Sequence, residues 1–177
     1  NTCSDDTCDP AIGCVNVCNN TCNLNNHGYG FYKRLCRGPH PSGEFLSMHD
    51  VECVNDTCTF ASVASVADIC DRLTPNPPSD KCEHAEAQFM TLMLNVCRCR
   101  INHYQPIDAS CGPGGTVGQA VADADAKLCN PNRTRDECVL SHCGIDEINT
   151  GKALWANSLL LQRVSAGSVK LTWNPTY

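Results

Sequence analysis

The sequence predicts an α+β fold: a small disulfide-rich helical bundle, preceded by an irregular cysteine-rich segment and followed by a C-terminal β-ribbon. The chain has 16 cysteines in 177 residues, a density typical of cross-linked proteins in oxidising compartments. Apolar residues between 60 and 143 recur at helical spacing behind capping signals. The final residues, GSVKLTWNPTY, alternate apolar and polar side chains as a strand does.

These patterns divide the chain into four segments. We expect a cysteine-rich segment at 1–26, a loop-rich disulfide-stapled subdomain at 27–59, a helical bundle at 60–156 and a ribbon at 157–177. Glycines and prolines between 28 and 43 indicate turns at short intervals. Leu, Ile, Val and Phe make up about a fifth of the chain, which is low for a self-sufficient core. Cross-links are therefore expected to supply part of the stability.

Four helices are expected in the bundle. The first covers about 60–73 and ends at the following prolines. The second is about five turns long, has the clearest apolar face and is expected at the centre of the fold. Gly144 is expected to interrupt the fourth helix. Pairs of residues at capping-box spacing mark the starts of the last three helices: Asp80 with Glu83, Thr116 with Gln119, and Thr134 with Glu137.

Charge and hydropathy exclude some partners. A formal net charge of −6 argues against a nucleic acid or an anionic membrane as partner, because both select for a basic face. No stretch of about 18 apolar residues exists, so we expect no membrane insertion. The chain opens on Asn1 and Thr2 rather than on a basic and then apolar leader, so either a signal was removed or this is an excised piece of a longer product. The expected location is extracellular or at the cell surface.

All the cysteines are expected to form disulfides, with a pairing that the sequence does not determine. A cytosolic metal binder is the alternative, and it is disfavoured because the cysteines do not form paired CxxC knuckles with zinc spacing. Cys97 and Cys99 are too close to face one another, so each is expected to have a different partner. The sixteen candidates are Cys3, Cys8, Cys14, Cys18, Cys22, Cys36, Cys53, Cys58, Cys70, Cys82, Cys97, Cys99, Cys111, Cys129, Cys138 and Cys143.

No catalytic, cofactor or metal motif is found, and we expect the protein not to be an enzyme. The six histidines lack the HxxxH and CxxCH spacings that place ligands together or attach a haem. His142 beside Cys143, and His49 beside Asp50, are the only local hints of thiol or acid–base chemistry.

Two acidic clusters are candidate calcium sites. The acids of DADAK (123–127) are two apart on a predicted helix and diverge, which disfavours a calcium loop. Asp5, Asp6 and Asp9 are the better candidates, although solvated acids remain the default interpretation. Three glycosylation sequons begin at Asn19, Asn55 and Asn132.

One aromatic and basic cluster allows two interpretations. It is a candidate ligand patch for a glycan or an anionic polymer, or the aromatic residues anchor a subdomain and the cations extend outward. The structural interpretation is the favoured one. The cluster comprises Tyr29, Phe31, Tyr32, Lys33, Arg34 and Arg37.

Three stretches resemble known sequences. CSDDTCDPAIGCV (3–15) resembles a cysteine-rich repeat, CxxDxCDPxxGCV, of large secreted bacterial proteins. The segment from 60 to about 156, with DRLTPNPPSDKCEHAEAQFMTLMLNVC at its core, resembles a domain of uncharacterised secreted bacterial proteins. LLLQRVSAGSVKLTW with the following NP resembles the opening strands of a fibronectin type III or related sandwich. The resemblances imply an extracellular modular parent and no particular activity.

The terminal ribbon suggests a function. Two strands around a turn at 165–168 leave apolar surface and unpaired edges, so something must cover them. The ribbon packs on its own bundle, continues into a further domain, or completes a sheet on a neighbouring copy. The leading hypothesis is an extracellular structural or assembly protein, a filament or surface-layer subunit that polymerises with itself by strand addition; the alternative is a secreted carbohydrate- or ligand-binding module excised from a larger cell-surface protein. The expected assembly interface comprises Leu159, Leu161, Val169, Leu171 and Trp173.

Overall fold

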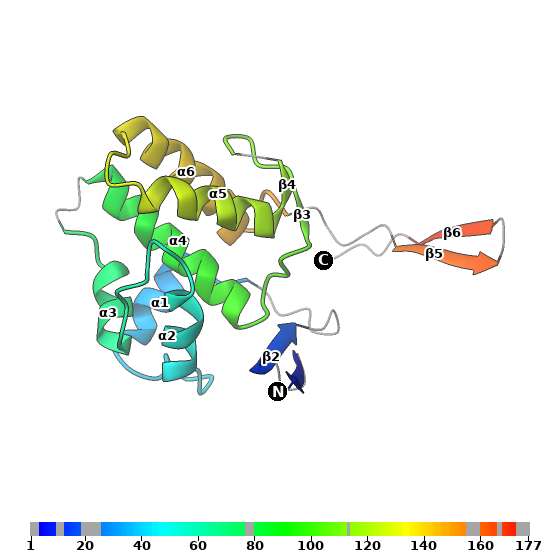
Figure 1. Ribbon diagram of the computed structural model, residues 1–177, viewed down its shortest axis with the longest axis horizontal. Helices are drawn as coiled ribbons and strands as arrows, with labels where there is room; N and C mark the ends of the chain where they lie inside the picture. The colour runs from blue at the N-terminus through cyan, green and yellow to red at the C-terminus, as the bar shows by residue number, and fades with distance from the viewer. Residues whose placement is uncertain are drawn as a thin grey trace.

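The computed structural model describes the backbone of residues 4–9, 13–18, 26–76, 80–112, 114–154, 160–165 and 168–172, and the side chains of those between 26 and 154. The described chain is mostly helical with small antiparallel sheets, so the α+β class is confirmed (Figure 1). The helices are α1 (Tyr29–Leu35), α2 (Met48–Asn55), α3 (Val66–Arg72), α4 (Lys81–Cys97), α5 (Val117–Cys129) and α6 (Arg135–Asn149). The strands pair in order as β1 (Ser4–Asp9) with β2 (Gly13–Cys18), β3 (Pro106–Ile107) with β4 (Gly115–Thr116), and β5 (Leu160–Ser165) with β6 (Ser168–Thr172).

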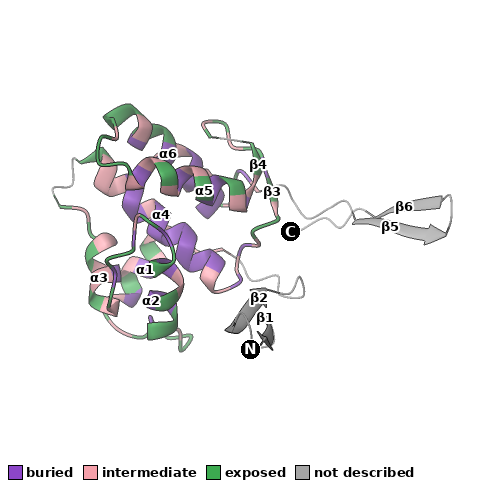
Figure 2. Cartoon of the chain, viewed as in Figure 1, coloured by how far each residue is buried: buried purple, intermediate pink, exposed green. Residues whose placement is uncertain are grey.

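Helix α4 is the centre of the fold, as its sequence predicts. Helices α5 and α6 lie on one side of it, and α1, α2 and α3 lie on the other (Figure 1). Helix α4 is buried over most of its length, from Ala85 to Val96, while its first turn is partly exposed (Figure 2). One hydrophobic cluster joins apolar side chains from Tyr32 to Ala153, so the core is continuous across the expected boundary at 59/60.

The three predicted capping signals are found at the starts of α4, α5 and α6. The Asp80 carboxylate accepts hydrogen bonds from the N–H groups of Cys82 and Glu83. Thr116 with Gln119, and Thr134 with Glu137, form reciprocal capping boxes. Local side-chain chemistry therefore sets these three helix starts.

The structure differs from the prediction in its first half. The segment 27–59, expected to be loop-rich, contains α1 and α2, and the segment expected to be irregular contains the β1–β2 hairpin. Helix α3 begins at Val66 rather than near 60, because Ser65 caps it and accepts a hydrogen bond from the N–H of Asp68. Short helices such as α1 depend on tertiary packing more than on propensity, and the glycines around α1 hid it from the sequence analysis.

Gly144 does not interrupt α6, which continues to Asn149. The glycine instead allows a close approach: a Cβ at position 144 would lie 3.2 Å from the Cα of Gly112. The segment that contains Gly112 is held against α6 by the Cys111–Cys143 disulfide. Gly144 is thus a packing residue between α6 and this segment.

We expect Gly144→Ala to lower the free energy of unfolding by about 1–3 kcal/mol, because the new methyl group meets backbone that is tethered and cannot easily move. Gly30, inside α1, is the matched control, since a Cβ there meets no atom within 4 Å. Gly30→Ala is expected to raise the free energy of unfolding by about 0.4–1 kcal/mol. Urea unfolding of both variants measures the difference, and equal stability of the two would contradict the packing role.

Disulfides tie the helices together. Cys53–Cys97 joins α2 to the end of α4, and Cys82–Cys138 joins the start of α4 to α6. Cys99 is disulfide-bonded too, so Cys97 and Cys99 have different partners, as predicted. The described chain contains no free cysteine. Three further bonds join described cysteines: Cys36–Cys70, Cys58–Cys129 and Cys111–Cys143. The side chains of Cys3, Cys8, Cys14, Cys18 and Cys22 lie outside the described residues.

The predicted C-terminal strands are present and pair with each other. The register places Leu161 opposite Leu171 and Arg163 opposite Val169, with an irregularity between Arg163 and Ser165. The pairing of Ser165 with Ser168 agrees with the expected position of the turn. Leu159 and Trp173 lie outside the described residues, as do the side chains of both strands, so the expected assembly interface stays a prediction.

Candidate functional site

The candidate ligand patch of the sequence analysis lies on and just after α1, and its aromatic residues are structural. Tyr32 has no exposed surface, and its hydroxyl donates to Asn95 Oδ1 at 3.0 Å. Burial raises the pKa of the Tyr32 phenol. The Tyr29 hydroxyl donates to the carbonyl of Leu73 at 2.8 Å. A ligand patch that uses Tyr32 is therefore wrong, since the ring cannot meet a ligand.

The basic residues of this cluster follow the structural interpretation. Lys33 lies over the ring of Tyr29, with its Nζ 5.5 Å from the ring centroid. Arg34 and Arg37 are exposed to solvent. Phe31 is half-buried and stacks on His27, with 3.5 Å between the ring centroids. The aromatic side chains anchor α1 and the cations extend outward.

A network of polar residues connects the segment before α2, α2 itself and the end of α4. Asp50 is almost fully buried and receives two hydrogen bonds of 2.8 Å from the guanidinium of Arg98. Glu44 pairs with Arg100. Because these charged groups pair with one another, the network stabilises the fold. Its paired charges are not available to bind a ligand.

The two local hints of thiol or acid–base chemistry are not brought together. His49 is exposed, while its neighbour Asp50 is bound to Arg98. The sulfur of Cys143 is bonded to Cys111, so no thiol stands beside His142. His142 lies instead against His84, with 6.3 Å between the ring centroids.

The histidine environments predict a loss of stability in mild acid. Burial lowers the pKa of His27 and of His142 from 6.5. Around His142, Asp146 opposes this shift, and His84 and Lys81 add to it. Because the unfolded chain binds more protons than the folded chain in this range, stability is full above pH 6.5 and is lost as pH falls through the lowered pKa values.

Urea unfolding between pH 7.5 and pH 5.5 measures this effect above the range where carboxylates ordinarily titrate. We expect the free energy of unfolding to decrease steadily below pH 6.5 and the slope to flatten in His142→Gln. His49→Gln changes an exposed histidine and serves as the control. A slope unchanged in His142→Gln, or flattened equally in both variants, would contradict this assignment.

The acids of the candidate calcium site in α5 have partners within the protein. Asp123 forms an ion pair with Lys127 at 2.6 Å, one turn along α5. Asp125 accepts hydrogen bonds from the backbone N–H groups of Cys58 and Thr59. These two acids therefore have structural partners. The side chains of Asp5, Asp6 and Asp9 lie outside the described residues.

Two of the three sequons lie within the described chain. The side-chain amide of Asn55 donates to the carbonyl of Val63 at 2.8 Å, which uses one of its two N–H groups. Asn132 lies exposed between α5 and α6, and its side chain is accessible to modification. Asn19 lies outside the described residues.

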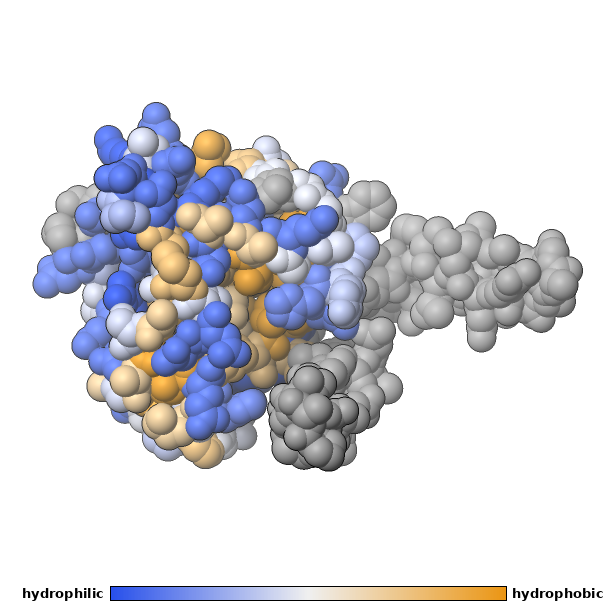
Figure 3. Space-filling model, viewed as in Figure 1, coloured by the Kyte–Doolittle hydropathy of each residue, from blue (hydrophilic) through white to orange (hydrophobic). Residues whose placement is uncertain are grey.

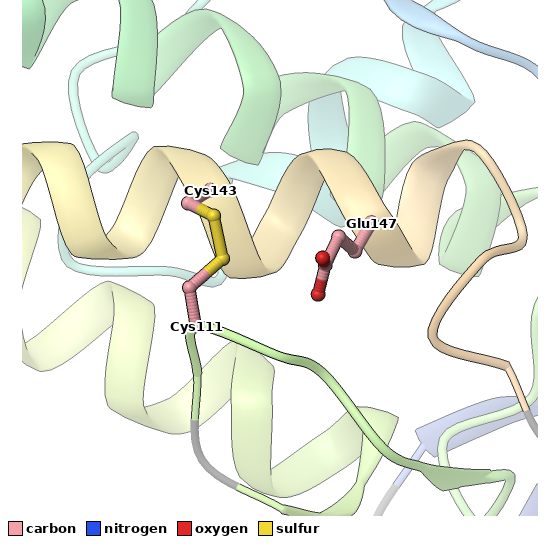
Figure 4. Close-up of side chains that lie close together, drawn as sticks. All are labelled: Cys111, Cys143 and Glu147. Carbon is pink, nitrogen blue, oxygen red and sulfur yellow. A yellow bond between two sulfur atoms is a disulfide. The ribbon is translucent and has the colours of Figure 1, made fainter.

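Within the described residues, one group of potential metal ligands converges: Cys111, Cys143 and Glu147. Both sulfurs belong to one disulfide and so provide no thiolate for a metal. Glu147 extends from α6 toward the segment that carries Cys111 (Figure 4). Its carboxylate accepts from the N–H of Ser110 at 2.6 Å and from the Ser110 hydroxyl, and these bonds lower its pKa. The Cys111–Cys143 disulfide and the hydrogen bonds from Ser110 to Glu147 together hold this segment on α6, and we call these contacts the latch.

The latch closes one wall of a cleft of about 460 Å³ between α5, α6 and the segment 107–112. This volume lies within the range of small-molecule sites. In Figure 3 apolar side chains gather across the middle of the face shown, over α4 and α5. The cleft is lined by Ala120, Asp123, Ala124 and Lys127 of α5, by Leu140, Ser141, Gly144, Ile145 and Ile148 of α6, and by Ile107, Ala109, Ser110, Cys111 and Gly112.

Small residues open the space between the two helices. Ala120 and Ala124 are one turn apart on α5, and their methyl groups do not fill the distance to α6. Leu140 stands at the cleft with 55% of its surface exposed. Asp123 and Lys127 are the charged residues in the lining, and their charges cancel in an ion pair. The cleft is therefore mainly apolar and offers a ligand no net charge there.

Ser141 is the exception in this lining. The residue is 7% exposed, and its buried hydroxyl oxygen has no hydrogen-bond partner among the described residues. Buried hydroxyl groups normally have partners. This residue cannot be identified from the sequence, because a single serine in a helix carries no signal and the alanines of α5 resemble ordinary core positions.

No helix in the described part of the chain is both long and apolar enough to cross a membrane. The disulfides are compatible with an oxidising, extracellular environment. The resemblances stated from the sequence stay predictions. No family model, no curated protein and no solved structure was found to match this chain.

Proposed function

We propose that this chain is an extracellular, disulfide-stapled binding module that takes a small, neutral, mainly apolar molecule in the cleft between α5, α6 and the segment 107–112. The cleft itself carries the proposal, because its volume and apolar lining are those of small-molecule sites. The binding class is the alternative that the sequence analysis named. The proposed binding site is not the aromatic cluster of α1, because Tyr32 of that cluster is buried in the core.

The walls of the cleft support a preformed site. The Cys111–Cys143 disulfide and the bonds from Ser110 to Glu147 fix the segment 107–112 on α6. On the far side, Cys58–Cys129 and the bonds from Thr59 to Asp125 fix α5. A rigid cavity loses little entropy when it binds a ligand, so its apolar area contributes to affinity.

Filling the cleft tests this function. The probe is 2-naphthol, and its binding to the oxidised full chain is followed by NMR shift changes of the backbone amides. Ala124→Leu extends a side chain into the cleft, whereas Ala122→Leu places the same side chain on the exposed face of α5. We expect saturable binding to the wild type and to Ala122→Leu, and at least tenfold weaker binding to Ala124→Leu.

The unfolding midpoint of Ala124→Leu is measured first, because a larger side chain can overpack the space. Ala120→Val adds less volume to the same wall of the cleft. This variant is used in place of Ala124→Leu if Ala124→Leu does not fold. Equal binding to the filled variants and the wild type, or no saturable binding at all, would overturn the proposal.

Assembly through the C-terminal strands is the second candidate function. Strands β5 and β6 form a sheet of two strands only, so neither outer edge pairs with another strand of the described chain. A two-stranded ribbon is marginally stable alone, and such edges accept further strands. The ribbon of one copy would add to the sheet of the next, giving an extracellular polymer stabilised by disulfides.

Particle mass in non-denaturing solution tests the assembly. We expect the full chain to form particles well above the 19.2 kDa of one copy, and a chain that lacks 158–177 to be a monomer. Light scattering measures both. A full chain that is monomeric at high concentration, or polymer that persists after the deletion, would exclude strand exchange.

A further inference from the structure

The unpartnered hydroxyl of Ser141 provides information about what the cleft binds. A serine inside a helix can satisfy its hydroxyl on the carbonyl group one turn earlier. Ser141 does not do so, and no other described residue pairs with it. With only 7% of its surface exposed, it has little access to bulk water either. Leaving such a group unpaired is unfavourable, so a ligand that pairs with it would gain affinity.

We propose that the ligand carries a neutral oxygen group, a hydroxyl or a carbonyl, that pairs with Ser141 while its apolar body fills the space beside Ala120, Ala124 and Ile145. This inference rests on the proposed function of the cleft. A serine hydroxyl both donates and accepts, so it pairs with either group. The ligand class is therefore a small amphipathic alcohol, phenol or ketone.

The charges around the cleft exclude an ionic ligand. Asp123 and Lys127 neutralise each other at 2.6 Å. Glu147, which does not line the cleft but bonds its wall, is occupied by the N–H and hydroxyl of Ser110. An ion would therefore lose its hydration without finding an opposite charge that is free to pair with it.

Two probes and two proteins isolate the hydrogen bond. The probes are 2-naphthol and 2-methylnaphthalene, which share a ring system and differ in a hydroxyl or methyl group. Their dissociation constants are measured for the wild type and for Ser141→Ala by NMR titration of the oxidised full chain. We expect the substitution to raise the dissociation constant of 2-naphthol about fivefold. The dissociation constant of 2-methylnaphthalene should stay unchanged or fall slightly.

Two controls separate recognition from folding. Ser141→Thr keeps a hydroxyl and is expected to restore most of the affinity for 2-naphthol. Ser42→Ala removes an exposed serine hydroxyl far along the chain and should change neither constant. The unfolding midpoint of ligand-free Ser141→Ala should equal or exceed that of the wild type, since the variant loses an unpaired buried group. A structural serine would give a lower midpoint.

The outcomes distinguish the two proposals. If both probes bind and Ser141→Ala weakens them equally or not at all, the role of Ser141 is overturned while the binding cleft stands. If neither probe binds to the wild type, the proposed function fails, and this inference fails with it. Selective loss of 2-naphthol affinity supports both.

Discussion

Asp50→Ala is expected to lower the free energy of unfolding by about 3 kcal/mol, the lower part of the range for breaking a buried ion pair. The side chain of Asp50 is 2% exposed and that of Arg98 is 16% exposed. The carboxylate accepts two hydrogen bonds from Arg98 and two from Ser47, which it caps at the start of α2. Removal leaves the guanidinium in a low-dielectric environment with one acid nearby, Glu44 at 3.6 Å.

The matched control is Asp123→Ala. Asp123 also belongs to an aspartate–cation pair, but its side chain is 37% exposed and that of Lys127 is 36% exposed. We expect it to cost about 0.2–1 kcal/mol. Both values come from urea unfolding at pH 7 and low salt. If Asp50→Ala costs no more than its control, the network around Asp50 is not what holds α2 against α4.

Replacing Cys82 and Cys138 together by alanine is expected to lower the free energy of unfolding by about 4 kcal/mol. The bond spans 56 residues, and its loss frees the unfolded chain from a closed loop, an effect of about 2–5 kcal/mol. Cys138 is also fully buried and belongs to the hydrophobic core, so the variant loses packing as well. Chemical unfolding without reductant, with the remaining disulfides intact, gives the value.

The double variant of Cys111 and Cys143 is the comparison. That bond spans 32 residues and joins two half-buried cysteines, so its loss removes a cross-link and little packing. We expect it to cost about 1 kcal/mol less than the Cys82–Cys138 variant. The double variant should also bind 2-naphthol more weakly, because one wall of the cleft is no longer fixed to α6. Equal costs would indicate that Cys138 contributes only as a cross-link.

The starts of α4, α5 and α6 are predictable from sequence because each is decided by neighbouring residues. Asp80, Thr116 and Thr134 satisfy the N–H groups of their own first turns, and no distant contact is required. Helix α2 has the same kind of signal in Ser47 and Asp50, which the sequence analysis overlooked. Local chemistry was thus sufficient for these elements.

Other features depend on contacts that no short stretch contains. Helix α1 is stabilised by the Tyr32 side chain in the core and by the Cys36–Cys70 bond, so its glycines do not decide its conformation. Gly144 is tolerated in α6 because Gly112, distant in sequence, packs against it. The disulfide pairing has the same character, since sixteen cysteines allow a very large number of arrangements.

The cleft could not be predicted for the same reason. Its walls come from three parts of the chain, and small residues such as Ala120 and Ala124 fit a packed core equally well. Only the tertiary structure shows that the residues opposite them leave space. The lack of a partner for Ser141 is likewise visible only when its surroundings are known.

The most direct test of the account is where a bound probe lies. Intermolecular nuclear Overhauser effects are measured between 2-naphthol and methyl groups of the oxidised full chain. We expect contacts to the methyl groups of Ala120, Ala124 and Ile145, which line the cleft. Contacts confined to exposed apolar side chains elsewhere, such as Met48 with 55% of its surface exposed, would contradict the account.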